Sequence, residues 1–179
     1  GGLVALDTQF LPSAAEEAIT RAESLTGKRV VAAVVLHANP DKFNGTATFQ
    51  RHGARVVTSA SVAKLLPAVH AQRKGKFWST YAPDYPADPP TPEVFDGADA
   101  AFEAAGVSLR LRAVGPGCSK AHVLASWEGH VFGGDLVANG HHAWLELGLV
   151  DAWAARLDEM AAGRPKFVHP GRGPSGGPE

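Results

Sequence analysis

The hydrophobic positions along the chain change between strand-like and helix-like spacing, and this alternation predicts an α/β protein. Leu3–Leu6 and Val30–Leu36 are short apolar runs, and the second is β-branched, as in strands that are covered on both faces. Between them, the segment 14–25 has apolar residues at helical spacing, and Pro12 and Ser13 mark its start. The order predicted is strand, helix, strand.

After a polar loop at 37–44, the pattern predicts a strand flanked by two helices. The strand is Arg55–Thr58, and the helices are 45–51 and 61–71. Proline, tyrosine and aspartate then gather between Lys74 and Pro92, where residues 81–90 cannot hold a regular helix or a central strand. We therefore expect a surface loop there, and its part from Trp78 to Pro92 could be a lid over a cleft, a dimer contact or neither.

The second half of the chain is predicted to be rich in strands. Its expected elements are strands at 100–102 and 107–114, a hairpin of 123–127 and 130–133, a helix at 149–160 and a short strand at 167–168. We expect a single domain at 1–173 and a flexible tail at 174–179. The chain begins inside a predicted strand, which suggests a domain truncated at its N-terminus.

Composition and charge exclude several classes of partner. With 179 residues, 45% of them hydrophobic, the chain can bury one sizeable core. The 17 basic and 18 acidic side chains are spread out, so we expect no nucleic-acid partner and no membrane partner. A single cysteine, Cys118, excludes internal disulfides and favours the cytoplasm. The expected partner is a small molecule, and a homodimer stays open.

Candidate chemistry lies in the loops that leave the carboxyl ends of strands, where side chains from separate elements converge. These loops are Asp7-Thr8, 37–42, Gly115–Ser119, Gly134-Asp135 and 170–173. Each loop alone is a weak signal, because a lone histidine or a Gly-Asp pair is more often structural. The order and spacing of the five loops indicate more about the protein than any single loop does.

The sequence of these loops resembles the metallo-β-lactamase superfamily. Its members carry H-x-H-x-D-H after a buried strand, then G-x-G-H-[ST], then Gly-Asp after a hairpin, and finally P-G-H-G. Here Leu6-Asp7-Thr8, Phe43–Phe49 and Gly133–Leu136 match further family segments in the same order. The resemblance implies a four-layer αββα sandwich, with the active site at one edge between the two sheets.

Most of the metal ligands that the resemblance implies are replaced. Of the seven positions, His37, Asp41 and Asp135 are kept, whereas the others hold Asn39, Lys42, Cys118 and Arg172. A cation has no lone pair to give and repels a dication, so Lys42 and Arg172 should abolish the second metal site. We expect them to form ion pairs with Asp41 and Asp135 instead.

For the other metal, two interpretations remain. A His nitrogen, a Cys thiolate and an Asp oxygen form an acceptable zinc set, so His37, Cys118 and Asp135 could hold one ion. Alternatively, His37 is only a hydrogen-bonded histidine and Cys118 a small buried hydrophobe. Other residues expected to line the site are Asp7, Asn39 and His142, the last of which could, with His141, supply a lost ligand.

Three functions therefore stay open. The preferred hypothesis is a pseudoenzyme or ligand-binding protein that has no cofactor. The second is a hydrolase that uses one zinc ion on an ester, thioester or amide. The third is a metal-independent enzyme in which Cys118 attacks as a thiolate favoured by Lys42, Arg172 and His37. If the chain is an enzyme, Asp41, Asp135 and Cys118 are its candidate catalytic residues.

Overall fold

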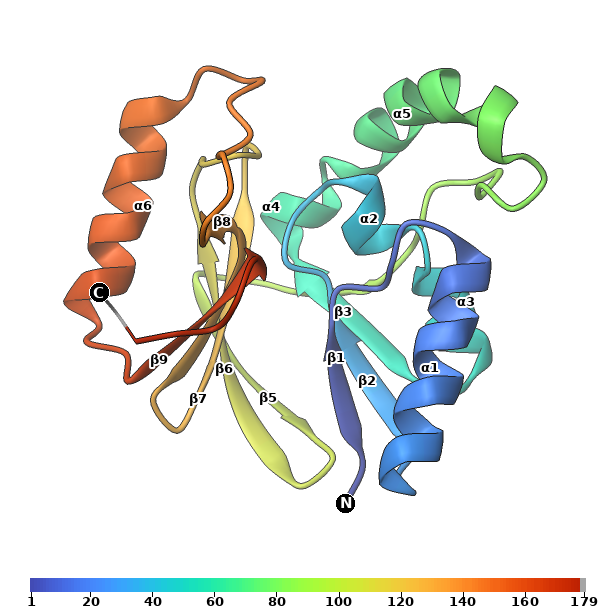
Figure 1. Cartoon of the computed structure of the whole chain (residues 1–179), viewed down its shortest axis with the longest axis horizontal. Coiled ribbons are helices and arrows are strands. Elements are labelled where there is room, and N and C mark those ends of the chain that lie inside the picture. The colour runs from blue at the N-terminus through green and yellow to red at the C-terminus, as the bar shows by residue number, and fades with distance from the viewer. Residues whose placement is uncertain (178–179) are drawn as a thin grey trace.

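Two β-sheets form the centre of the molecule in the computed structural model, which describes residues 1–177 (Figure 1). The first sheet is parallel, in the order β1-β2-β3-β4, with strands Leu3–Leu6, Val30–Val34, Arg55–Ser59 and Glu93–Phe95. The second has the order β5-β6-β7-β8-β9, with strands Asp99–Ala104, Val107–Val114, His122–Trp127, His130–Ala138 and Phe167–Arg172. Its pairs are antiparallel except β8 with β9, which is parallel.

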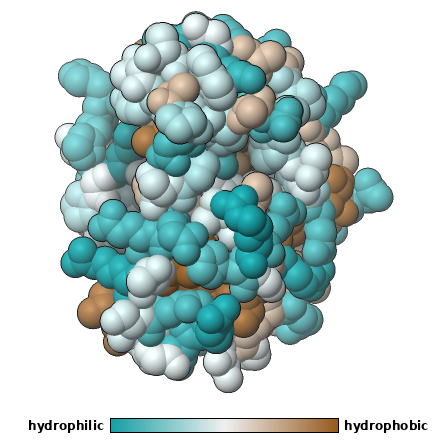
Figure 2. Space-filling view, turned by 90° about the vertical axis from the view of Figure 1, so that its right-hand side faces the viewer, coloured by the Kyte–Doolittle hydropathy of each residue, from teal (hydrophilic) through white to brown (hydrophobic). Residues whose placement is uncertain are grey.

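Helices cover the outer face of each sheet, which gives the four layers (Figure 1). The helices are α1 (Pro12–Thr26), α2 (Pro40–Phe43), α3 (Thr46–Arg51), α4 (Ala60–Ala63), α5 (Leu66–Tyr81) and α6 (Val150–Ala162). Helices α1 and α3 lie beside the first sheet and α6 beside the second. Seen from the side of α1 and α3, the surface is mostly hydrophilic (Figure 2). No helix among the described residues is long and apolar enough to cross a membrane.

The main core lies between the two sheets because both contribute apolar inner faces. Val34 and Val56 from the first sheet belong to one buried cluster with Leu111 and Val123 from the second. The sheets also touch through backbone at one point. The amide of Val123 donates to the carbonyl of Leu36 at 2.7 Å, and His37 forms a β-bridge with His122. This junction places the end of β2 against the start of β7.

Most predicted elements are confirmed, and the largest difference is α5. The helix continues to Tyr81, so the loop expected from Lys74 begins only at Ala82. Rings of Phe77 and Tyr81 on this helix pack edge-to-face against Phe10, with centroids 5.2 and 5.1 Å apart. These edge-to-face contacts stabilise the extra turns. The helix ends at Tyr81 because Pro83 disfavours helical geometry at the residue before it, Ala82.

Three smaller differences concern strands and the tail. Strand β4, which was not predicted, pairs with the edge of β3, and Gly134-Asp135, predicted as a turn after the hairpin, lies inside β8. Gly134 has φ 53°, and the register shifts there as in a β-bulge. The tail was expected to be flexible from Pro174, yet Gly176 forms two backbone hydrogen bonds with Val168. The last two residues of that tail, 178 and 179, lie outside the described residues.

Gly45 permits the close approach of the loop after β1 to the start of α3. A methyl group at this position would overlap the carbonyl oxygen of Thr8 and crowd Ala15. We expect Gly45→Ala to lower the free energy of unfolding by about 3 kcal/mol, since overpacking forces backbone shifts. Gly75→Ala is the matched control, because it is exposed on α5 with open space around it. It should raise stability by about 0.5–1 kcal/mol.

Urea denaturation monitored by circular dichroism gives both values. Equal stability of the two variants would show that the contact between Gly45 and Thr8 is not tight.

Candidate functional site

Five separate segments bring the candidate residues to one edge of the two sheets. Asp7 follows β1, His37 follows β2, Cys118 lies between β6 and β7, Asp135 is in β8 and Arg172 ends β9. Asp7 and His37 follow the carboxyl ends of parallel strands, whereas Cys118, Asp135 and Arg172 come from a loop and two strands of the second sheet. The residues are up to 165 positions apart in the sequence, and only the fold makes them neighbours.

Lys42 lies at the centre of three carboxylates. Its Nζ is 3.0 Å from Asp135 Oδ1, 3.1 Å from Asp41 Oδ2 and 3.8 Å from Asp7 Oδ2. The side chain of Lys42 is buried, so these ion pairs operate with little screening by water. A single ammonium group is therefore shared by three carboxylates at this edge.

The backbone of the loop fixes Lys42 in this position. Pro40 begins the short helix α2, and the carbonyl oxygen of Lys42 accepts two hydrogen bonds from Thr8, one from its amide at 2.8 Å and one from its Oγ1 at 2.9 Å. Thr8 is fully buried. The loop after β1 thus holds the loop after β2.

Arg172 adds a second cation at the more open side of the cluster. One of its guanidinium nitrogens is 3.4 Å from Asp41 Oδ2 and 3.4 Å from Asp135 Oδ2. The side chain is half-exposed, so these pairs contribute less than those of Lys42. Asn39 completes this group, because its amide donates to Asp41 Oδ1 at 2.5 Å.

The pKa values in this cluster follow from burial and charge. Burial raises the pKa of Asp7 from 3.8 to about 6, although Lys42 opposes the change. Burial also works against the charged form of Lys42, yet Asp7, Asp41 and Asp135 outweigh it and raise the pKa of Lys42. Burial raises the pKa of Asp135, but the neighbouring His37 and Lys42 hold it well below its usual range. Lys42 and Asp135 are therefore charged at neutral pH.

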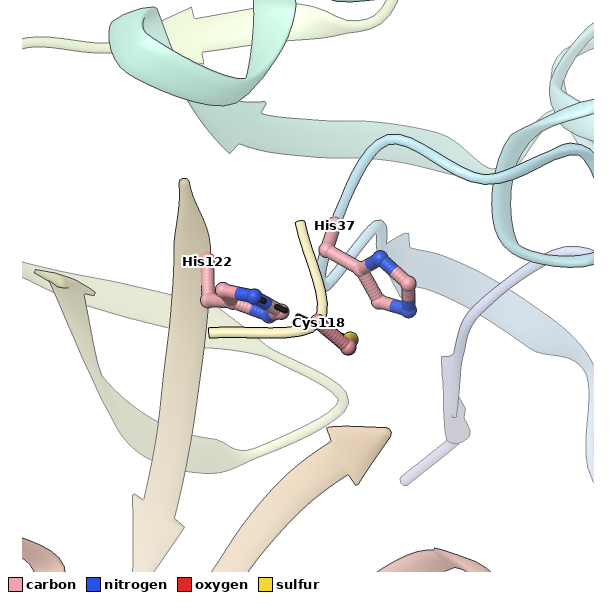
Figure 3. Close-up of side chains that lie close together, drawn as sticks. All are labelled: His37, Cys118 and His122. Carbon is pink, nitrogen blue, oxygen red and sulfur yellow. Dashed lines mark hydrogen bonds between the residues drawn. The ribbon is translucent and has the colours of Figure 1, made fainter. Parts of the chain in front are cut away.

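A second, softer group of donors lies beside this cluster. One nitrogen from each of His37 and His122 and the Sγ of Cys118 lie within 4.8 Å of one another (Figure 3). Asp135, expected as the third ligand, is not in this group, although its Oδ2 is 3.5 Å from His37 Nε2. The residue that sequence reasoning missed is His122. Its available signal was a polar residue at the start of an otherwise apolar strand, four positions after Cys118.

The thiol of Cys118 is not activated. Burial and the nearby Asp135 raise its pKa to about 12, while Lys42 lowers it only in part. The expectation that nearby cations favour the thiolate is therefore wrong for the metal-free protein, because desolvation of the sulfur and the carboxylates outweigh Lys42.

His141 and His142 lie apart from the site. Both are exposed, and neither lines the cavity beside the cluster, because they lie in the turn that follows β8. His142 was expected to line the site, and the structure corrects this. His169 is also elsewhere: its Nε2 is 2.9 Å from His130 Nδ1 on the neighbouring strand.

A cavity of about 780 Å³ opens beside the two donor groups. This volume is in the range of small-molecule sites. Its wall has an apolar part with Phe10, Leu65, Ala68, Val69, Phe77, Trp144 and Leu147, and a polar part with His37, Asn39, Asp41, Gln72, Arg73, Lys76, Cys118, Ser119, Lys120, Asp135, Glu146 and Arg172.

Comparison with known proteins identifies the architecture. By sequence, the chain matches no protein-family model and no curated protein. By structure, it is similar to a metallo-β-lactamase from Pontibacter korlensis, with a TM-score of 0.73 and 27% identity over 99% of this chain and 77% of that one. The chain has the fold of the metallo-β-lactamases.

Two further metallo-β-lactamases show the same fold at lower identity. FIM-1 from Pseudomonas aeruginosa, in a mono-zinc form, has a TM-score of 0.73 and 19% identity over 97% of this chain and 73% of that one. The enzyme from Erythrobacter litoralis, with beta-mercaptoethanol in its active site, has a TM-score of 0.74 and 21% identity over 98% and 75%. The four-layer sandwich predicted from the loops is confirmed.

The residues of this metallo-β-lactamase-fold protein fit two metals poorly and one metal better. A second ion among Asp41, Lys42, Asp135 and Arg172 would meet two cations that already pair with both carboxylates. A first ion among His37, Cys118 and His122 would meet two imidazoles and a sulfur, which zinc accepts as ligands. The buried nitrogens of His37 have no hydrogen-bond partner among the described residues.

Lys42 should be the most costly charge to remove from this fold. We expect Lys42→Met to lower the free energy of unfolding at pH 7 by about 3–5 kcal/mol, because it leaves buried carboxylates without their cation. The loss should shrink toward pH 4, where those carboxylates take up protons. Lys120→Met is the control, since Lys120 is exposed and forms no ion pair within residues 1–177. A small, pH-independent loss in Lys42→Met, measured by urea denaturation, would show that the three carboxylates do not depend on this ammonium group.

Asp7 should make stability fall as the pH rises. Its pKa is about 6 in the folded protein against an ordinary 3.8, so the folded state keeps a proton that the unfolded chain has lost. The contribution is fully present below about pH 4 and is lost as the pH passes 6. We expect the stability of the wild type relative to Asp7→Asn to fall over this range by up to about 3 kcal/mol. Parallel unfolding profiles of the two proteins against pH would refute the shift.

Proposed function

We propose that this chain is a ligand-binding member of the metallo-β-lactamase superfamily that lacks the two-metal centre. The observation that carries the proposal is Lys42, whose ammonium group lies within 3.0–3.8 Å of Asp7, Asp41 and Asp135. An ammonium group supplies positive charge but cannot polarise a carbonyl as a Lewis acid or lower the pKa of a bound water as a metal does. In this proposal the fold keeps its cleft and has cations beside its carboxylates, but it lacks the two ions that would activate a water molecule.

The cleft supports binding of a small anionic molecule that has an apolar part. The three carboxylates that line the cleft already have cationic partners: Asp41 and Asp135 pair with Lys42 and Arg172, and Glu146 pairs with Arg73. Lys76 and Lys120 form no ion pair in the part of the chain that the structure describes, and they remain for a ligand. Phe77 and Leu147 supply apolar contacts in the same cleft.

A one-metal hydrolase acting on an ester, thioester or amide is the second candidate. The grouping of His37, Cys118 and His122 favours it, and one structural neighbour is described in a mono-zinc form. Against it stands Asp135, the nearby carboxylate that would serve as general base, because Lys42 and Arg172 already bind it. An enzyme that depends on the Cys118 thiolate has less support, since the pKa of this thiol is about 12.

Binding of a fluorescent anion tests the proposal. We expect 8-anilinonaphthalene-1-sulfonate, which joins an apolar ring system to a sulfonate, to bind the folded protein with a fluorescence increase. Lys120→Glu should weaken this binding about tenfold, as expected for the loss of one charge contact. Lys28→Glu, an exposed cation in the turn between α1 and β2, is the charge-matched control and should leave binding unchanged.

Two results would overturn the proposal. One is equal weakening by the two charge reversals, which would mean that the dye responds to net charge and not to the cleft. The other is zinc-dependent turnover of an ester, thioester or β-lactam that a chelator abolishes, which would instead establish the hydrolase.

A further inference from the structure

The junction between the two sheets places two histidine side chains next to each other. His37, at the end of β2, and His122, at the start of β7, form a backbone bridge. Their rings lie side by side, with centroids 4.9 Å apart and an angle of 32° between the planes (Figure 3). Because this backbone contact joins the sheets, the arrangement of the two rings is built into the fold and does not depend on a mobile loop.

Cys118 extends from the loop before β7 toward both rings (Figure 3). Its Sγ is 3.8 Å from Nε2 of His122. Gly117 allows this approach, because a methyl group there would overlap Leu136 and lie 3.3 Å from His122 Nε2. Three segments thus bring two imidazole rings and a sulfur atom close together.

Burial leaves these rings with unused nitrogens. His37 is 2% exposed, and neither of its ring nitrogens has a hydrogen-bond partner in the described part of the chain; the same is true of Nδ1 of His122, which is 1% exposed. Buried polar atoms without a partner are costly and rare in native proteins, and they point to an unassigned ion or water. The neighbouring Asp135 Oδ2 lies 3.5 Å from His37 Nε2, as in carboxylate–histidine–metal arrangements.

The hydrogen bond to His122 indicates which of its ring nitrogens could bind a metal ion. The amide of Ser119 donates to its Nε2 at 3.1 Å, so that nitrogen carries a lone pair and the ring proton is on Nδ1. Nε2 is also the nitrogen that faces Cys118. A small movement of the Ser119 amide would free this lone pair for an ion.

The charges nearby also suit one divalent ion. If all groups are ionised, Asp7, Asp41 and Asp135 carry three negative charges against the two positive charges of Lys42 and Arg172. With Cys118 as thiolate, the local sum is −2, which one dication neutralises. Asp135 contacts Lys42 through Oδ1 and His37 through Oδ2, so the carboxylate lies between the ammonium group and the donor group.

We propose that His37, Cys118 and His122 bind one soft divalent ion, of which Zn²⁺ is the expected example, with His122 in place of a ligand from Asn39. Zinc bonds of about 2.0 Å to nitrogen and about 2.3 Å to sulfur place tetrahedral donors about 3.5 Å apart. Side-chain rotations can bring the three donors, now within 4.8 Å, to that spacing. His37 and Cys118 line the cavity, which gives the ion an entry path and leaves a fourth position facing it.

Cobalt substitution tests the site without any assay of activity. The full chain, reduced and freed of metal, is titrated with Co²⁺. We expect one equivalent to bind and to give a near-ultraviolet charge-transfer band, the signature of a thiolate bound to the ion. Cys118→Ser should abolish the band, and mass spectrometry of the zinc-loaded protein should give one ion per chain.

His122→Gln decides whether the third ligand is the one proposed. It should weaken zinc binding more than about 100-fold, since even residues that only support a ligand cost 10–100-fold. Asp135→Asn should keep the charge-transfer band, and His142→Gln is the control histidine, exposed and away from the cavity. Circular dichroism confirms that each variant is folded.

Two outcomes would overturn the proposal. One is that the folded wild-type protein binds no Co²⁺ or Zn²⁺ at micromolar concentrations. The other is that His122→Gln binds the ion as tightly as the wild type, whereas Asp135→Asn no longer binds it. The proposal does not rest on the function of the cleft. Anion binding can fail while this metal site is present, and the reverse is also possible.

Discussion

The ion pairs of Lys42 are the interaction on which the functional edge of this fold depends. Three carboxylates from β1, from the loop after β2 and from β8 meet there, and without a cation they would repel one another in a poorly hydrated place. A buried ion pair gains little over a well-packed apolar contact, but removal of one partner leaves the other charge buried and uncompensated. The three carboxylates therefore depend on Lys42 for their close approach.

A metal ion and a lysine can each reduce the repulsion between converging carboxylates. Both bring positive charge to converging carboxylates, and both can therefore hold the loops of a metallo-β-lactamase fold in place. Only the metal accepts lone pairs and acidifies a bound water. The chain has a TM-score of 0.73 to a metallo-β-lactamase although Lys42 lies among its carboxylates, so this fold is compatible with either source of positive charge.

Sequence patterns predicted the fold well because its elements are local. The apolar runs of β1 and β2 and the amphipathic spacing of α6 appear in the structure within one or two residues of the expected bounds at most ends. Helix α5 was predicted too short because its last two turns depend on Phe10, 67 positions before Phe77, and no local pattern contains that contact. The same holds for β4, whose three residues form a strand only because β3 offers an open edge.

From the sequence, only those site residues could be predicted that lie in the loops whose order resembles the family's motifs. His37, Asp41, Lys42, Asp135 and Arg172 occupy recognisable positions, and they do lie together. His122 could not be identified in this way, because its proximity to His37 arises from the bridge between β2 and β7. A histidine at the start of a strand does not by itself indicate a metal site, and only its tertiary contact with His37 and Cys118 does so.

Asp135 divides the functional edge into two chemically distinct parts. On one side are hard oxygen atoms with Lys42 and Arg172, and on the other are the softer nitrogen and sulfur atoms of His37 and Cys118. The two parts share this one carboxylate and little else, so cations in the first part do not exclude a metal ion in the second. Substitution of metal ligands in this fold is therefore better judged for each group of donors separately than for the whole motif at once.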